Sequence, residues 1–127
     1  MKSIGSVMIV LDSSALLAYL FRETGSELVA DHLKEASIGA ANWCEVLGKV
    51  EGSITRSWAD ALLMALGVSI EPVTKADAIK AAEIFDRDPS LSLGDRLCLA
   101  LADRMEAQVL TADRAWGSNP TVVQIRA

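Results

Sequence analysis

Short apolar runs alternate along the chain with longer segments in which apolar residues recur at helical spacing. The apolar runs, each predicted to be a β-strand, are residues 7–11, 38–40, 68–73, 109–111 and 122–125. The first run is apolar throughout, which predicts a central strand buried on both faces. The alternation of strands and helices predicts an α/β fold, a three-layer sandwich with a five-stranded parallel sheet covered by helices on both faces.

Six helices are predicted between these strands. They cover residues 14–21, 28–36, 43–50, 58–66, 75–87 and 97–105. His32 shares the apolar stripe of the second helix, so a structural role is expected for it. Gly67 is placed to end the fourth helix. In the fifth helix the spacing predicts that Ile79, Ala82 and Phe85 are buried.

The 127 residues are predicted to form one domain, residues 1–127. A formal net charge of −5 argues against binding of nucleic acid through overall charge, so any phosphate must be bound locally. Cys44 and Cys98 lie in apolar helical patterns, which indicates reduced thiols rather than a disulfide framework. Asp12 interrupts the first apolar run early, and no run of about 18 apolar residues follows. We therefore expect a soluble cytoplasmic protein with no membrane contact.

Two of the predicted strands run directly into an acidic residue, Asp12 and Asp113. Parallel strands end at the same edge of a sheet, and neighbouring strands lie about 4.8 Å apart. Two carboxylates about 5 Å apart repel each other by roughly 3 kcal/mol at an effective dielectric constant near 20. If the two strands are neighbours, either one carboxylate takes up a proton or a cation lies between them.

Glu45 and Asp95 are further candidates, each at the start of a predicted helix. Asn42 with Glu45, and Ser92 with Asp95, have the spacing of a capping box, in which the acidic residue only completes the helix terminus. Two other pairs have the same spacing, Thr24 with Glu27 and Thr74 with Asp77. Asp12 also fits an ordinary helix cap. Spacing alone does not decide whether these acids only cap helices or also take part in the chemistry of a site.

Four segments, in this order, resemble the PIN domain and, within it, the VapC-type toxins of bacterial and archaeal toxin–antitoxin pairs. They are Val-Leu-Asp-Ser-Ser at 10–14, Asn-Trp-Cys-Glu-Val at 42–46, Ser-Leu-Gly-Asp-Arg-Leu-Cys-Leu-Ala-Leu-Ala at 92–102 and Leu-Thr-Ala-Asp at 110–113. The third is the most characteristic of the family. The resemblance implies the strand order 3-2-1-4-5 and the convergence of Asp12, Glu45, Asp95 and Asp113 on one pocket. Asp77, after the edge strand and roughly 10 Å from Asp12, is left as a helix cap.

The resemblance implies a Mg²⁺- or Mn²⁺-dependent endoribonuclease, an enzyme that hydrolyses RNA phosphodiesters with a metal-activated water and leaves a 5′-phosphate and a 3′-hydroxyl. Carboxylates are hard oxygen ligands that suit either metal. By analogy, Asp12 and Asp113 are direct metal ligands, and Asp95 is a ligand directly or through water. Glu45 is an outer ligand or a base that orients the water.

Several polar residues near these acids are expected to have supporting roles. Ser14 and Thr111 either orient waters or carboxylates, or serve only as cap and strand end. Arg96 either pairs with the acids or reaches a substrate phosphate. Trp116 is expected to pack under a loop rather than stack on a base. The scattered basic residues that could contact RNA are Arg22, Lys49, Arg56 and Arg114.

The resemblance also implies partners, namely an RNA substrate (transfer or ribosomal RNA), a cognate antitoxin protein and a second copy in a homodimer formed through the second-helix region. A mean hydropathy of +0.30 is consistent with apolar surface that a partner covers. One alternative is a Mg²⁺-binding phosphoacceptor or phosphatase-like domain, although Asp12-Ser13-Ser14 lacks the Asp-x-Asp motif of such phosphatases. Another is a catalytically silent PIN module that only binds a protein.

Overall fold

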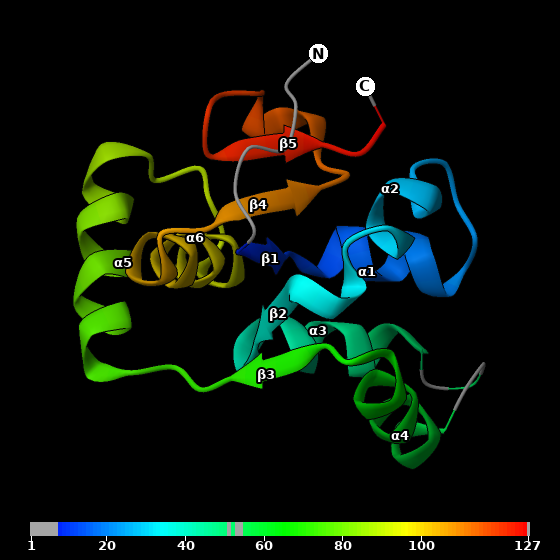
Figure 1. Ribbon diagram of the computed structural model, residues 1–127. Helices are drawn as coiled ribbons and strands as arrows, with labels where there is room; N and C mark the ends of the chain where they lie inside the picture. Colours follow the sequence, from blue (N-terminus) through cyan, green and yellow to red (C-terminus); the bar gives the residue numbers. More distant parts are fainter. Residues whose placement is uncertain (1–7, 51, 53–54, 127) are drawn as a thin grey trace.

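The computed structural model describes residues 8–50, 52 and 55–126, so Val7 of the first predicted strand lies outside the described residues. The strands are β1 (Ile9–Leu11), β2 (Ala36–Gly39), β3 (Ser69–Glu71), β4 (Gln108–Thr111) and β5 (Val122–Gln124). They form one sheet in the order β3-β2-β1-β4-β5, and every neighbouring pair is parallel (Figure 1). The predicted fold class and strand order are confirmed.

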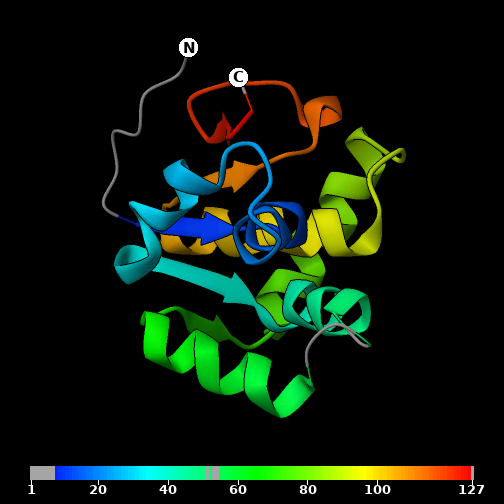
Figure 2. The same ribbon diagram turned by 90° about the vertical axis from the view of Figure 1, so that its right-hand side faces the viewer.

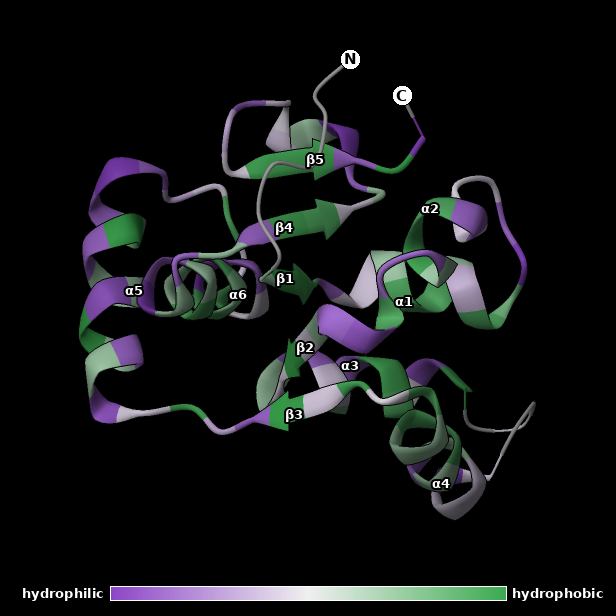
Figure 3. Cartoon of the chain, in the orientation of Figure 1, coloured by the Kyte–Doolittle hydropathy of each residue, from purple (hydrophilic) through white to green (hydrophobic). Residues whose placement is uncertain are grey.

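The central strand β1 is buried on both faces, as its apolar sequence predicted. Its three residues are 0% exposed, and Leu11 lies in register with Ile38 of β2 and Leu110 of β4. Because side chains alternate along a strand, Ile9 and Leu11 belong to one core cluster and Val10 to the other. The green of β1 and β4 in Figure 3 marks this apolar centre of the sheet.

In the described part of the chain, six helices surround the sheet. They are α1 (Ser13–Leu20), α2 (Ser26–Ala30), α3 (Ala40–Val50), α4 (Arg56–Leu66), α5 (Lys75–Arg87) and α6 (Leu93–Met105), with short 3₁₀ helices at Leu33–Glu35 and Arg114–Trp116. Cys98 and Leu101 of α6 pack against Val10, whereas α1, α3 and α4 contribute to the core on the opposite face. Figure 2 shows α4 as the outermost helix beside β3. Gly67 ends α4 in the left-handed conformation, as expected. Within the described part of the chain, no helix has the length and apolar character needed to span a membrane.

The second predicted helix is wrong in its extent. It ends at Ala30, and β2 begins at Ala36, because residues 36–39 complete the sheet beside β1. The predicted capping box of Thr24 with Glu27 is also wrong, since the N-cap of α2 is Gly25 with φ +95°. A Cβ on Gly25 would lie 2.6 Å from the carbonyl oxygen of Ile125, so the α1–α2 loop packs closely on the chain after β5.

The helix α5 has the predicted bounds but buries a different face. The residues expected in the core, Ile79, Ala82 and Phe85, are exposed. Asp77, Ala81 and Ile84 are buried instead. Asp77 forms the predicted capping box with Thr74, and it also accepts hydrogen bonds from Arg104 of α6 at 2.9 and 3.1 Å. This ion pair turns the Asp77 face of α5 toward α6.

Candidate functional site

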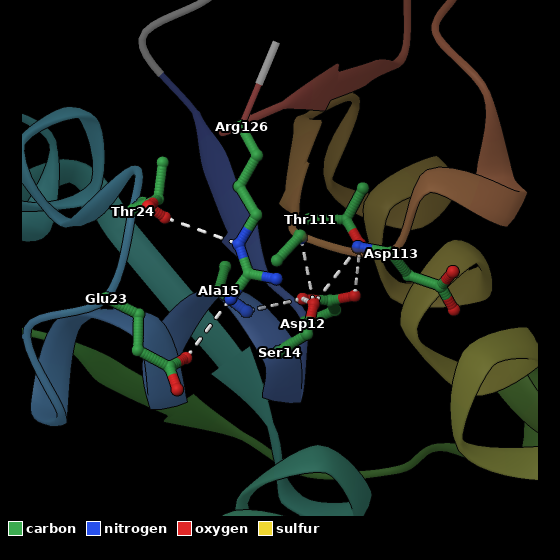
Figure 4. Close-up of polar contacts among 9 residues, drawn as sticks. Asp12, Ser14, Ala15, Glu23, Thr24, Thr111, Asp113 and Arg126 are labelled. Carbon is green, nitrogen blue, oxygen red and sulfur yellow. Dashed lines mark hydrogen bonds and ion pairs between the residues drawn. The ribbon is translucent and has the colours of Figure 1, made fainter.

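Asp12 follows β1 directly and is held by three hydrogen bonds (Figure 4). The backbone amide of Ala15 donates to Oδ1 at 2.8 Å, so Asp12 is the N-cap of α1. Ser14 Oγ donates to the same oxygen at 2.7 Å, and Thr111 Oγ1 donates to Oδ2 at 2.5 Å. Asp12 is only 4% exposed, and its orientation is fixed by the first turn of α1 and by the end of β4.

The electrostatic environment of Asp12 disfavours its ionised form. Burial, with a smaller contribution from the charge of Asp95, raises the pKa of Asp12 to about 6, because together they outweigh the hydrogen bonds from Thr111, Ser14 and Ala15, which lower it. Among the described residues no lysine or arginine forms an ion pair with Asp12. A bound cation would supply the missing counter-charge.

The hydroxyls of Ser14 and Thr111 cross-link the ends of β1 and β4. Ser14 Oγ accepts a hydrogen bond from the amide of Ala112 at 2.9 Å, and Thr111 Oγ1 accepts one from the amide of Asp113 at 3.0 Å. Each hydroxyl also donates to the Asp12 carboxylate. Of the roles left open by the sequence, orientation of a carboxylate is therefore the one observed for both residues.

Asp95 and Asp113 line the same cavity, of about 300 Å³, which we call the Asp95 cavity. Asp95 forms the predicted capping box with Ser92, accepting from its amide at 3.4 Å. Asp113 caps the 3₁₀ helix by accepting from the amide of Ala115 at 2.9 Å, and its carboxylate points away from Asp12 (Figure 4). A carboxylate has about four lone-pair positions, so these caps leave both side chains able to bind a cation.

Trp116 also lines the Asp95 cavity. Its side chain is half-buried and packs against the core cluster that contains Val10, in agreement with the predicted packing role. The indole Nε1 is buried, and no hydrogen-bond acceptor for it lies among the described residues.

Glu45 is held against the first turn of α6 by Asn42. The amide of Asn42 donates to Glu45 Oε1 at 3.1 Å and to the carbonyl oxygen of Gly94 at 3.2 Å. The Glu45 carboxylate lies over the Cα of Gly94, where a Cβ would be 2.7 to 2.9 Å from its atoms. The predicted capping role of Asn42 is wrong, because α3 begins two residues earlier, at Ala40, and Asn42 lies inside its first turn.

The buried thiol of Cys98 lies within the electrostatic field of three of the four acids. Burial raises its pKa well above the ordinary value, and the charges of Asp12, Asp95 and Glu45 add to the effect. These acids come from the end of β1, the first turn of α6 and the middle of α3, so the fold brings together segments that are distant in the sequence.

The predicted convergence of the four carboxylates on one pocket is not seen in the Asp95 cavity. Asp12 and Glu45 are absent from the lining of the Asp95 cavity. In residues 8–50, 52 and 55–126, no three His, Cys, Asp or Glu side chains lie close enough together to hold one metal ion. The reason is local, since hydrogen bonds within the first turns of helices hold Asp12, Asp95 and Asp113, and Asn42 holds Glu45. In chemical type the donor set nevertheless fits a hard divalent cation, because it consists of carboxylate oxygens.

Arg96 does not pair with the acids, which was one of the two roles expected for it, and the other, contact with a substrate phosphate, stays a prediction. Its guanidinium donates to the carbonyl oxygens of Leu91 at 3.3 Å and Ala81 at 3.2 Å, and it lies 4.9 Å from the ring centre of Phe85. One residue along a helix is a rotation of about 100°, so the residue after Asp95 faces α5 rather than the acids. Cys44 lies in an apolar helical pattern of the sequence but is exposed in the structure.

Three residues that contribute to the site were missed in the sequence. Asn42 was interpreted as a cap, and Gly94 was not considered, although a glycine inside a helix indicates a close approach by another group. Arg126 extends over the α1–α2 loop, where it donates to Glu23 Oε1 at 3.1 Å and to the carbonyl oxygen of Thr24 at 3.4 Å (Figure 4). Its signal was its place just after the last strand, at the sheet edge where Asp12 also lies.

Comparisons with known proteins give a family and a set of similar folds. The family model described as PIN domain matches residues 9–119. A chain of a toxin–antitoxin complex from Klebsiella pneumoniae is 16% identical with a TM-score of 0.80, covering 92% of this chain and 97% of that chain. Mycobacterium tuberculosis VapC20, described as a toxin that cleaves the sarcin–ricin loop, is 20% identical with a TM-score of 0.68, covering 88% and 97%.

A third similar structure is a chain of DNA-bound VapBC from Salmonella typhimurium, 13% identical with a TM-score of 0.69, covering 94% of this chain and 99% of that chain. At these low sequence identities, the three structures show only that this chain has a similar fold. No match was found among curated proteins.

Proposed function

This chain belongs to the PIN domain family, and on that premise we propose that it is a Mg²⁺- or Mn²⁺-dependent endoribonuclease that acts in the cytoplasm as the toxin of a toxin–antitoxin pair. The observation that carries the proposal is the position of Asp12. This buried carboxylate is within the electrostatic influence of Asp95 and has no cationic side chain beside it among the described residues. Such a site favours a divalent cation.

The proposed ligands are Asp12, Asp95 and Asp113, whose side chains would have to turn toward one another to share one ion, with Glu45 as an outer ligand or as the base that orients the attacking water. When bound, the metal would compensate the carboxylate charges, polarise a phosphate oxygen and lower the pKa of a bound water. Thr111 and Ser14 keep the Asp12 carboxylate in one orientation through their hydroxyl groups. Asn42 occupies Glu45 Oε1, which leaves Oε2 able to accept a proton from the attacking water. Hydrolysis would leave a 5′-phosphate and a 3′-hydroxyl.

The substrate and partners are proposed from the family and its structural relatives. VapC20 is described as a toxin that cleaves the sarcin–ricin loop, and this supports RNA as the substrate class, a transfer or ribosomal RNA. Relatives were solved in toxin–antitoxin complexes, which supports a protein antitoxin. Trp58 and Met64 of α4 are 54% and 73% exposed, so apolar surface is available for a protein partner. A homodimer through the second-helix region is part of the same proposal.

The test is cleavage of RNA by the purified chain. We expect cutting in Mg²⁺ or Mn²⁺, no cutting after EDTA, and loss of cutting in Asp12→Asn and in Asp95→Asn. Asp60→Asn, on the exposed side of α4, is the matched control and should cut like the parent. Folded Asp12→Asn protein that cuts at the parental rate would falsify the assignment.

The same variants separate this proposal from its alternatives. A catalytically silent module would cut RNA under none of these conditions. A phosphoacceptor domain would be labelled by a small phospho-donor, whereas we expect no labelling. In cells, expression without a partner should slow growth, and Asp12→Asn should relieve the effect.

A further inference from the structure

A second cavity meets the acidic site from the side of α1. It has a volume of about 480 Å³, and its lining includes Ser14, Leu17, Phe21, Lys49, Asp113 and Arg126. We call it the Lys49 cavity. Asp113 lines both this cavity and the Asp95 cavity, so the two lie on either side of a proposed metal ligand.

The charges of the two cavities differ. The Lys49 cavity has two cationic residues, Lys49 and Arg126, against the acidic Glu23 and Asp113. The described lining of the Asp95 cavity has three aspartates and no lysine or arginine. A polyanion that reaches Asp113 is therefore repelled on one side and can be bound on the other.

Lys49 is placed on the site by the helix that carries Glu45. The two residues are four apart on α3, so they lie on the same face one turn from each other. Lys49 is exposed and has no ion pair within the described residues. Its ammonium group is thus available to a ligand.

Phe21 adds an apolar face to the same cavity. It ends α1 as the C-cap residue and is 43% exposed, although a large aromatic side chain is usually covered. Exposed aromatic rings beside a cationic groove are the usual platform on which the bases of single-stranded nucleic acid stack.

We propose that a single-stranded RNA segment next to the scissile phosphate lies in the Lys49 cavity, with one phosphate against Lys49 and Arg126 and one base stacked on Phe21. This inference rests on the proposed ribonuclease function and adds the side from which the RNA enters. Arg126 is already held by Glu23, and the RNA phosphate competes with that carboxylate for its guanidinium.

The alternative path runs through a third cavity, of about 650 Å³, between α5, α6 and the segment before β5, where Lys80 and Arg87 lie. It shares Leu99, Asn119 and Val122 with the Asp95 cavity, where a polyanion would meet Asp88 and Asp95 as well as Asp113. Lys80 is also paired with Asp103 at 3.7 Å. Both linings hold two cationic and two acidic residues, so it is the additional Asp88 and Asp95 on this path that favour the Lys49 cavity.

The test measures binding of a fluorescein-labelled single-stranded RNA of about 12 nucleotides in an Asp95→Asn background, which prevents cutting. We expect Lys49→Gln and Phe21→Ala each to raise the Kd roughly tenfold in fluorescence anisotropy. Lys49→Gln should also lower the slope of log Kd against log salt concentration by about 0.7, because one phosphate contact is lost, whereas Phe21→Ala should not. Arg87→Gln is the control and should change neither.

Glu23→Gln separates an RNA contact from a structural clamp. If Arg126 binds phosphate, removal of its competing carboxylate should lower the Kd by about two- to threefold. If Arg126 only clamps the loop, the variant should bind RNA no better than its parent.

An effect of Arg87→Gln with no effect of Lys49→Gln would overturn the inference, as would an unchanged salt slope in Lys49→Gln. The wild-type background distinguishes the two proposals. Cutting of this RNA in Mn²⁺ at parental rates by Lys49→Gln and Phe21→Ala would refute the RNA path alone. Absence of cutting by the unsubstituted chain, with no stabilisation by metal, would refute the ribonuclease function itself.

Discussion

The hydroxyl of Thr111 donates a hydrogen bond of 2.5 Å to Oδ2 of Asp12 and so joins the end of β4 to the end of β1. This contact links residues 99 positions apart in the sequence and fixes a carboxylate that is only 4% exposed. Its removal affects both the orientation of Asp12 and the energy of its ionised form.

Thr111→Val keeps the shape of the side chain and removes the donor. We expect a loss of about 1.5 to 3 kcal/mol in the free energy of unfolding at neutral pH, the typical contribution of a hydrogen bond to a charged group. The pKa of Asp12 should rise further, because this bond lowers it, and the pH profile of RNA cutting should move to higher pH. Thr111→Ser retains the donor and should restore both properties. A pH profile unaltered in Thr111→Val contradicts the proposed role.

Gly94→Ala should displace Glu45 without unfolding the protein. The new Cβ would lie 2.7 Å from Glu45 Oε2, and the carboxylate at the end of a flexible side chain can move away. A displacement of about 1 Å in a catalytic group lowers the rate of RNA cutting by roughly 100-fold. Gly48→Ala is the matched control, because nothing lies within 4 Å of its Cβ position in α3. It should keep full activity and be more stable by about 0.5 to 1 kcal/mol.

The stability of the metal-free protein should depend on the pH through Asp12. Its pKa is about 6 in the folded state against 3.8 as the ordinary value, so between these values the folded state binds more protons. Stability therefore falls as the pH rises from about 4 to about 6, by up to about 3 kcal/mol. Asp12→Asn lacks this loss and should unfold at higher urea concentration than the parent at pH 7.5 in EDTA.

Metal should reverse the difference between these two proteins. Mn²⁺ added at pH 7.5 binds the folded parent and raises its melting temperature, whereas Asp12→Asn should show little change. Equal stabilisation of both proteins by Mn²⁺ would remove Asp12 from the set of metal ligands. This readout requires no RNA.

The two cysteines should differ in reactivity. Cys44 is exposed, whereas Cys98 is 0% exposed and has a pKa well above the ordinary value. In the folded protein at pH 8 we expect DTNB, an aromatic disulfide reagent, to modify Cys44 and leave Cys98 unmodified. Urea should expose both thiols, and Cys44→Ser should leave the folded protein unreactive. Rapid modification of Cys98 in the folded protein would contradict the prediction that burial protects this thiol.

Arg104→Gln should destabilise the protein and spare its activity. The guanidinium of Arg104 forms an ion pair with Asp77, whose side chain is 4% exposed, but its own side chain is 34% exposed. We therefore expect a loss of about 1 to 2 kcal/mol, less than for a fully buried pair. Lys80→Gln removes the more exposed pair with Asp103 and should cost less than about 0.5 kcal/mol. Urea unfolding measures both effects, and an equal loss in the two variants argues against a special role for Arg104.

The fold was predictable from the sequence where strands are buried on both faces of the sheet, because such strands are apolar throughout. The apolar residues of β1, β2 and β4 are removed from water only in the centre of a sheet. The segment at 92–102 was the most characteristic part of the family resemblance. The capping boxes of Asp77 and Asp95 were also predictable, because a cap is a contact within one helical turn.

The sequence by itself determined the five strands and the four acidic residues, with Asp12 and Asp113 at the ends of strands and Asp95 at the start of a helix, whereas Glu45 lies in the middle of α3. Only the tertiary structure decided which face of α5 is buried, that Arg96 turns toward α5, and that Asn42 and Gly94 hold Glu45. It also decided that Lys49 and Arg126, far apart in the sequence, line one cavity. The physical reason is the distance along the sequence over which each kind of interaction acts. Periodicity and capping act over a few residues, whereas these contacts join segments whose separation in space is fixed only when the helices pack on the sheet.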